Sequence, residues 1–129
     1  PACCAVGLRN VELIESEKLV ERSALMGRRL LTGLEGLRDL PNVGDVRGLG
    51  MMCGIELVEK KETRAPAIGL GPRVAKEALS RGLIFRLRGG AADPAIGDTI
   101  CIAPPPSTPT ETLDRIPDII RASIVAATK

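Results

Sequence analysis

The sequence has no histidine, tryptophan or tyrosine, and only one phenylalanine among its 129 residues. Without histidine the chain lacks the commonest general acid/base and the histidine ligands of most zinc sites, and with one aromatic ring it cannot stack a series of nucleic-acid bases. Lysine and arginine total 18 against 16 acidic residues, a net charge of +2, which gives no basic footprint for nucleic acids or anionic membranes. We therefore expect no metal site, no nucleic acid and no membrane partner.

The sequence has four cysteines, two of them adjacent, and no C-x-x-C pair. Each lies among apolar residues, so we expect small buried side chains in a reducing compartment. No apolar run approaches the roughly 20 residues that span a bilayer, and no signal peptide with a basic start is visible. These features predict a cytoplasmic globular domain, to which Cys3, Cys4, Cys53 and Cys101 contribute apolar contacts.

Two helices are expected at the N-terminus. Residues 1–8 are apolar on every side, and such a helix needs cover all round, so we expect another part of a larger protein to pack there. Ser16 can cap a second helix that ends near Leu40, because Pro41 disfavours helical geometry before it. Its apolar stripe indicates a core face more than a dimer seam, since three glycines weaken a coiled coil; the stripe is Leu19, Met26, Leu30, Leu34 and Leu37.

Residues 43–58 change to the two-residue period of β-strands, with a short strand at 43–47 and a longer one at 49–58. The expected buried face of the longer strand is Leu49, Met51, Cys53, Ile55 and Leu57. The glycines between and within these strands do not have the G-x-G-x-x-G spacing of a dinucleotide-binding loop, so tight turns explain them better.

Two further helices are predicted, one on each side of a second strand pair. Pro72 suits the first turn of a helix that buries Val74, Ala75, Ala78 and Leu79 and stops at Gly82. Thr108 and Glu111 have capping-box spacing, so the last helix should begin at Pro109 and kink at Pro117. The order of elements predicts an α+β fold, in which a small antiparallel sheet of three to four strands carries helices on one face after two N-terminal helices.

Residues 82–90 and 98–105 read as two short buried strands, separated by a flexible loop at 89–97. Arg86 lies in the middle of the first. A buried guanidinium needs an anion, since an unpaired buried charge costs several kcal/mol. Arg86 is therefore either a carboxylate-binding residue at the mouth of an active site or an edge-strand residue that points into water.

Several phrases of the chain, in order, resemble the C-terminal part of class III (omega) aminotransferases, enzymes of fold type I that use pyridoxal 5′-phosphate. The phrases are Pro1-Ala2 with the helices after it, VGDVRG at 43–48, GMMCGIEL at 50–57, GLIFR at 82–86 and ICIAPP at 100–105. The resemblance spans nearly all 129 residues. It departs from the usual pattern at Pro106, Ser107 and Pro117.

The resemblance implies that residues 1–129 are the small C-terminal domain of such an enzyme, with 1–16 a helix leading in from a large domain. It implies transfer of an amino group between an amine or amino acid and an oxo acid, usually by a homodimer. Arg86 matches the arginine that in many members contacts the substrate carboxylate, while Arg88 has no clear counterpart and leaves open which guanidinium does this.

None of the lysines of the chain suits the attachment of a cofactor. A lysine that forms a Schiff base needs a desolvated site that lowers its pKa, whereas these lie in a charged loop, on polar helix faces or at the end: Lys18, Lys60, Lys61, Lys76 and Lys129. We therefore expect no catalytic residue and no bound cofactor in this chain itself. The alternative is a non-catalytic α+β module that binds small carboxylates or mediates oligomer contacts.

Overall fold

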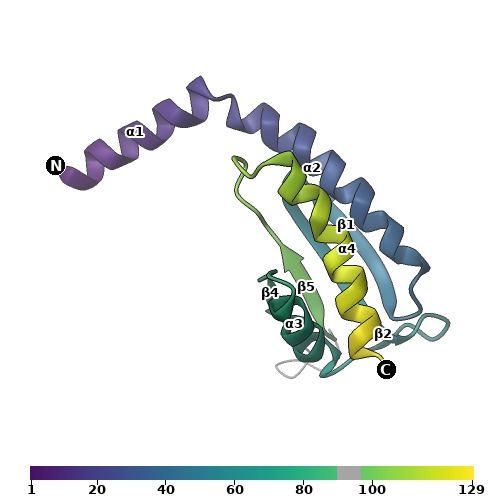
Figure 1. The fold of residues 1–129 in the computed structure, drawn as a ribbon. Coiled ribbons are helices and arrows are strands. Elements are labelled where there is room, and N and C mark those ends of the chain that lie inside the picture. The colour runs from purple at the N-terminus through teal and green to yellow at the C-terminus, as the bar shows by residue number, and fades with distance from the viewer. Residues whose placement is uncertain (90–96) are drawn as a thin grey trace.

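Helices cover one face of an antiparallel β-sheet in the computed structural model, which describes residues 1–89 and 97–129 (Figure 1). The elements in chain order are α1 (Ala2–Ser16), α2 (Leu19–Glu35), the 3₁₀ helix η1 (Gly36–Asp39), β1 (Val43–Leu49), β2 (Met52–Lys60), β3 (Ala65–Pro66), α3 (Leu70–Ser80), β4 (Arg86–Arg88), β5 (Thr99–Ile102) and α4 (Thr110–Ala127).

The strands form a sheet in the order β1-β2-β5-β4, and every neighbouring pair is antiparallel. The two-residue β3 pairs with β2 outside this path. The predicted α+β fold, with a small antiparallel sheet after two N-terminal helices, is confirmed, and β3 is the addition that sequence periodicity missed. Two residues are too few to show a period.

The core lies between the sheet and the helices α2, α3 and α4. Helix α4 buries the stripe predicted for it, Leu113, Ile116, Ile120 and Ile124. Pro117 lies inside α4 and packs close to Gly33 of α2, where a β-carbon would crowd the proline ring. Helix α2 buries only part of its predicted stripe fully, with Leu30 and Leu34 inaccessible.

Helix α1 projects away from the rest of the chain (Figure 1) and contains no buried residue. Lys18, in the left-handed region with φ 49°, separates it from α2. The predicted cap at Ser16 is wrong, because Ser16 is the last residue of α1 and its hydroxyl bonds to the Leu13 carbonyl. The expected burial of Cys3 and Cys4 is likewise wrong, as both are exposed.

The β1–β2 hairpin corrects the predicted face of the longer strand. Met51, Cys53, Ile55 and Leu57 are buried as expected, but Leu49 is 89% exposed. Leu49 ends β1 and pairs with Met52, so the turn at Gly50, with φ 54°, interrupts the two-residue period between Leu49 and Met51. A period carries no information across a turn.

The later helices agree with expectation only in part. Helix α3 begins at Leu70 and has Pro72 in its first turn, as predicted, but it leaves Leu79 exposed. Its predicted stop at Gly82 is confirmed, because Gly82 has φ 81° and the Leu83 and Gly82 amides bond back to Ala78 and Leu79, the pattern of a Schellman cap. Helix α4 begins at Thr110, with no side-chain cap from Thr108.

A strand forms within residues 82–90 as predicted, but its predicted burial is wrong. Among residues 82–89 the strand comprises Arg86–Arg88, which lies at the edge of the sheet and exposes both of its arginines. The partner strand β5 is central and buried as predicted. Most of the loop predicted at 89–97 lies outside the described residues. None of the helices in the described ranges combines the length and apolar composition that a membrane span requires.

The tight packing of α2 against the β1–β2 turn gives a prediction about stability. A β-carbon on Gly27 would overlap the backbone of Gly50, so Gly27→Ala must push the helix from the hairpin. Although alanine favours helices over glycine by about 1 kcal/mol, we expect a net loss of about 1–3 kcal/mol in the free energy of unfolding, measured by urea denaturation.

The matched control is Gly7→Ala in α1, where a β-carbon meets no other atom within 4 Å. We expect this variant to be no less stable than the parent, because only the intrinsic preference of alanine for helices acts there. Equal effects of the two substitutions would contradict the close packing of α2 on the hairpin.

Candidate functional site

The two faces of the sheet differ in chemistry. The face toward the helices carries buried apolar side chains such as Val46, Ile55 and Ile100. Because successive strand residues point to opposite faces, the residues between them share the other face, which we call the open face. Strand pairing arranges its residues in two rows, Arg47–Gly54–Cys101–Arg86 and Asp45–Glu56–Thr99–Arg88.

Arg86 lies in β4, at the edge of the open face. Strand pairing sets it opposite Cys101 of β5, while Leu87 between the two arginines packs against the core. Its guanidinium has no hydrogen bond or ion pair with any residue that the structure describes. At this exposed edge position water can solvate the guanidinium, so its charge needs no partner within the chain. The same exposure leaves the guanidinium accessible to an anion.

A hollow of about 710 Å³ adjoins Arg86. Its walls are mainly apolar, and we call it the Arg86 hollow; it is bounded by residues 83–86, 101–105, Thr108, Thr112 and Ile116. An apolar wall beside a single cation matches the usual composition of small-molecule sites, in which few polar groups fix the orientation of the ligand.

Arg22 of α2 holds one wall of this hollow in place. Its Nε donates to the Pro106 carbonyl at 2.7 Å, and its Nη2 donates to the Thr108 carbonyl at 2.9 Å. These bonds tie the proline-rich segment after β5 to α2. Nothing local in the sequence indicates this role of Arg22, because its carbonyl partners lie 84 and 86 residues away.

Asp98 connects the elements that flank β4. It is 1% exposed, and its Oδ2 accepts a hydrogen bond of 2.7 Å from the amide of Gly71 in the first turn of α3. Its own amide donates to the Ala67 carbonyl, and its carbonyl accepts from the Leu57 amide. A carboxylate is favourable at a helix N-terminus, so Asp98 fixes α3 against the start of β5.

Sequence analysis placed Asp98 at the start of a strand without assigning it a role. The available signal was an acidic residue directly before a run of apolar strand residues, since aspartate is rarely buried without partners. Gly71 shows how tightly the elements meet, because a β-carbon there would clash with Leu87 and touch Asp98.

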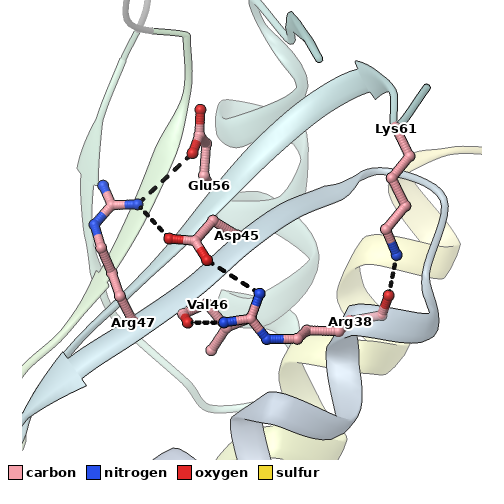
Figure 2. Close-up of polar contacts among 6 residues, drawn as sticks. All are labelled: Arg38, Asp45, Val46, Arg47, Glu56 and Lys61. Carbon is pink, nitrogen blue, oxygen red and sulfur yellow. Dashed lines mark hydrogen bonds and ion pairs between the residues drawn. The ribbon is translucent and has the colours of Figure 1, made fainter. Parts of the chain in front are cut away.

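An ionic network occupies the β1–β2 end of the open face (Figure 2). Asp45 accepts from Arg38 at 3.0 Å and from Arg47 at 3.1 Å. Arg47 also lies 3.7 Å from Glu56, and Arg38 donates to the Val46 carbonyl. The network ties η1 to the hairpin and uses both acids of the open face.

The pKa of Asp45 lies below its usual value. Its partial burial would raise the pKa, but hydrogen bonds from Arg47 and Arg38 favour the ionised carboxylate and outweigh burial. Cys53, on the core side, has a pKa raised by burial, which makes it a poor nucleophile. Within the described ranges, no group of three or more potential ligands could hold a metal ion.

Comparison with known proteins gives a consistent result. The family model described as "Aminotransferase class-III" matches residues 1–124. A curated relative, the adenosylmethionine-8-amino-7-oxononanoate aminotransferase of Nitratidesulfovibrio vulgaris, is 37% identical over 98% of this chain and 22% of its own length. The enzyme of the same description from Anoxybacillus flavithermus is 32% identical over 98% of this chain and 27% of its own.

Solved structures show the same fold. An aminotransferase from Bacillus anthracis superposes with a TM-score of 0.90 at 36% identity, over 98% of this chain and 28% of that one. The omega transaminase of Pseudomonas jessenii in complex with PMP gives a TM-score of 0.83 at 34% identity, over 96% and 26%. This chain thus spans about a quarter of the length of the relatives that it matches.

The buried Asp98 gives a testable prediction. Asp98→Ala removes the acceptor for the buried Gly71 amide, so we expect the free energy of unfolding to fall by about 1–3 kcal/mol. Asp98→Asn retains an acceptor oxygen and should lose less. Urea denaturation would measure both, with Asp118→Ala on the exposed side of α4 as the control. An Asp98→Ala variant as stable as this control would exclude the proposed anchoring of α3.

The network around Asp45 predicts a dependence on pH. Its folded-state pKa is lower than the value of about 3.9 in an unfolded chain, so its contribution is present at neutral pH and is lost as pH falls through the folded-state pKa. Asp45→Asn should be less stable at pH 7 by about 0.5–1 kcal/mol, a small value because the carboxylate is partly exposed.

Chemical denaturation at several pH values would measure this difference, which should shrink as pH falls below about 4. Glu62→Gln, in the exposed turn between β2 and β3, is the control and should show no such trend. A difference between Asp45→Asn and the parent that stays constant down to pH 2 would mean that the ionised carboxylate contributes nothing.

Proposed function

The chain belongs to the class-III aminotransferase family, and on this premise we propose that the protein of which it is part moves an amino group between an amine or amino acid and an oxo acid. Enzymes of this family use pyridoxal phosphate. The observation that carries the proposal is the family match over residues 1–124, together with a fold that superposes on solved transaminases.

Within that enzyme, residues 1–129 would form the small C-terminal domain, and α1 would lead in from a large domain. Two features support this assignment. The chain accounts for only 22–28% of its relatives' lengths, and α1 exposes apolar side chains including Val6, Leu8 and Val11. Exposed apolar surface of this kind marks contacts with another part of a protein. We further propose that the intact enzyme is a cytoplasmic homodimer.

The described residues do not fit as an anchor for the cofactor. All five lysines are exposed, and Lys61 donates to the Arg38 carbonyl. Schiff-base formation needs a desolvated amine, which an exposed side chain does not provide. The cofactor, which would supply the electron sink for transamination, therefore belongs to the large domain in this proposal.

The role proposed for this chain is to bind the substrate carboxylate through Arg86. Its planar guanidinium can form two parallel hydrogen bonds with a carboxylate. The Arg86 hollow offers apolar walls for the rest of the substrate, and Arg22 and Asp98 fix the segments around it. Binding by a positioned cation would orient the substrate without taking part in proton transfer.

Substitution of Arg86 in the full-length enzyme tests this role. Arg86→Ala should lower kcat/KM for carboxylate-bearing substrates by roughly ten- to a hundredfold, because hydrogen bonds to charged groups contribute about 1.5–3 kcal/mol each. Amines without a carboxylate should be little affected. Steady-state kinetics with an amino acid and with a simple amine measures the two values.

Arg115→Ala, an exposed arginine on α4, is the matched control for charge and should leave both substrates unchanged. An equal loss for the amino acid and the amine would show that Arg86 acts through stability. No loss for either would show that it only occupies an edge strand.

A further inference from the structure

The open face holds a second arginine beside Arg86. Arg86 and Arg88 lie two residues apart in β4, opposite Cys101 and Thr99 of β5. Alternate residues of a strand share a face, at about 7 Å between their α-carbons. The two side chains therefore leave the same strand on the same side, while Leu87 packs into the core between them.

Neither Arg86 nor Arg88 forms an ion pair with an acidic residue that the structure describes. The acids of the open face are Asp45 and Glu56, and both are engaged by Arg47, with Arg38 as a further donor to Asp45. The next residue across from Arg88 is Thr99, not a carboxylate. This end of the face thus carries two like charges with no internal counter-ion among the residues that the structure describes.

There is space for an anion next to Arg88. A second hollow of about 690 Å³, which we call the Arg88 hollow, lies over Gly54, Thr99 and Cys101, with Arg47 and Arg88 also in its lining. Gly54 contributes no side chain to this hollow. The Arg86 and Arg88 hollows share Cys101, Ile102 and Ala103, so they adjoin each other.

We propose that Arg88 forms a second anion subsite that binds the distal carboxylate of a dicarboxylic amino or oxo acid. The carboxylate next to the reacting carbon would bind Arg86, as in the proposed function, on which this inference rests. The separation of two same-face strand residues suits the two ends of a short dicarboxylate, and the guanidinium of Arg88 can form two parallel hydrogen bonds with its distal carboxylate.

Charged side chains on an edge strand also discourage pairing with other chains. That role needs charge alone and predicts no dependence on substrate. The experiment therefore compares two oxo acids of equal chain length, 2-oxoglutarate and 2-oxopentanoate, which differ by the distal carboxylate. Steady-state kinetics would give kcat/KM for both in the full-length enzyme and in Arg88→Ala, Arg86→Ala and Arg115→Ala.

Arg88→Ala should lower the ratio of kcat/KM for 2-oxoglutarate to that for 2-oxopentanoate by tenfold or more, while Arg115→Ala leaves the ratio unchanged. Arg86→Ala should lower kcat/KM for both acids. An unchanged ratio in Arg88→Ala, or an equal loss for both acids, would overturn the second subsite. Failure of Arg86→Ala to discriminate carboxylates from amines would instead refute the role proposed for Arg86, and the Arg88 ratio would still decide this inference.

Calorimetric titration of the same proteins with glutarate and pentanoate provides a readout independent of turnover. The parent should bind glutarate more tightly than pentanoate, and Arg88→Ala should lose that preference. A parent without the preference, or an Arg88→Ala variant that keeps it, would overturn the proposal even if neither oxo acid is a substrate.

Discussion

The hydrogen bond from the Gly71 amide to the buried carboxylate of Asp98 joins the first turn of α3 to the start of β5. The carboxylate holds the N-terminus of α3, and the backbone of the same residue bonds to Ala67 and Leu57 on either side of β3. Helix α3 leads through its Gly82 cap into β4, and β5 begins directly after Asp98. Asp98 thus anchors both α3, which leads into β4, and β5, which pairs with β4. We expect its loss to loosen the strand that carries the arginines.

The sheet separates packing from binding. Its covered face supplies stability through apolar contacts with α2, α3 and α4, whereas its open face concentrates charge. The Asp45 network neutralises the β1–β2 end of that face, so the positive charge that remains is concentrated at β4. Two faces with alternating residues allow this separation without conflict, because a change on one face leaves the side chains of the other in place.

Sequence periodicity correctly predicted those features of the fold that depend on residues close together in the sequence. The stripe of α4, the alternating buried residues from Met51 to Leu57 and the stop at Gly82 are confirmed, because each follows from residues near in sequence. The predicted caps at Ser16 and Thr108 failed, since capping depends on the exact residue at which a helix begins. The predicted burial of 82–90 is wrong because a sequence pattern can indicate a strand but not its position in the sheet. Strand pairing places β4 at the edge.

The same limit applies to the site. The type of residue and the resemblance selected Arg86, but the neighbours that give it context are distant in sequence: Arg22 fixes a carbonyl 84 residues away, and Asp98 caps a helix 27 residues before it. Arg88 was ambiguous because two arginines in one strand look equivalent in sequence. Pairing distinguishes them, since Arg86 adjoins the mainly apolar hollow and Arg88 the one floored by Gly54 and Thr99. Equivalent side chains therefore acquire different binding environments from the strands that lie opposite them.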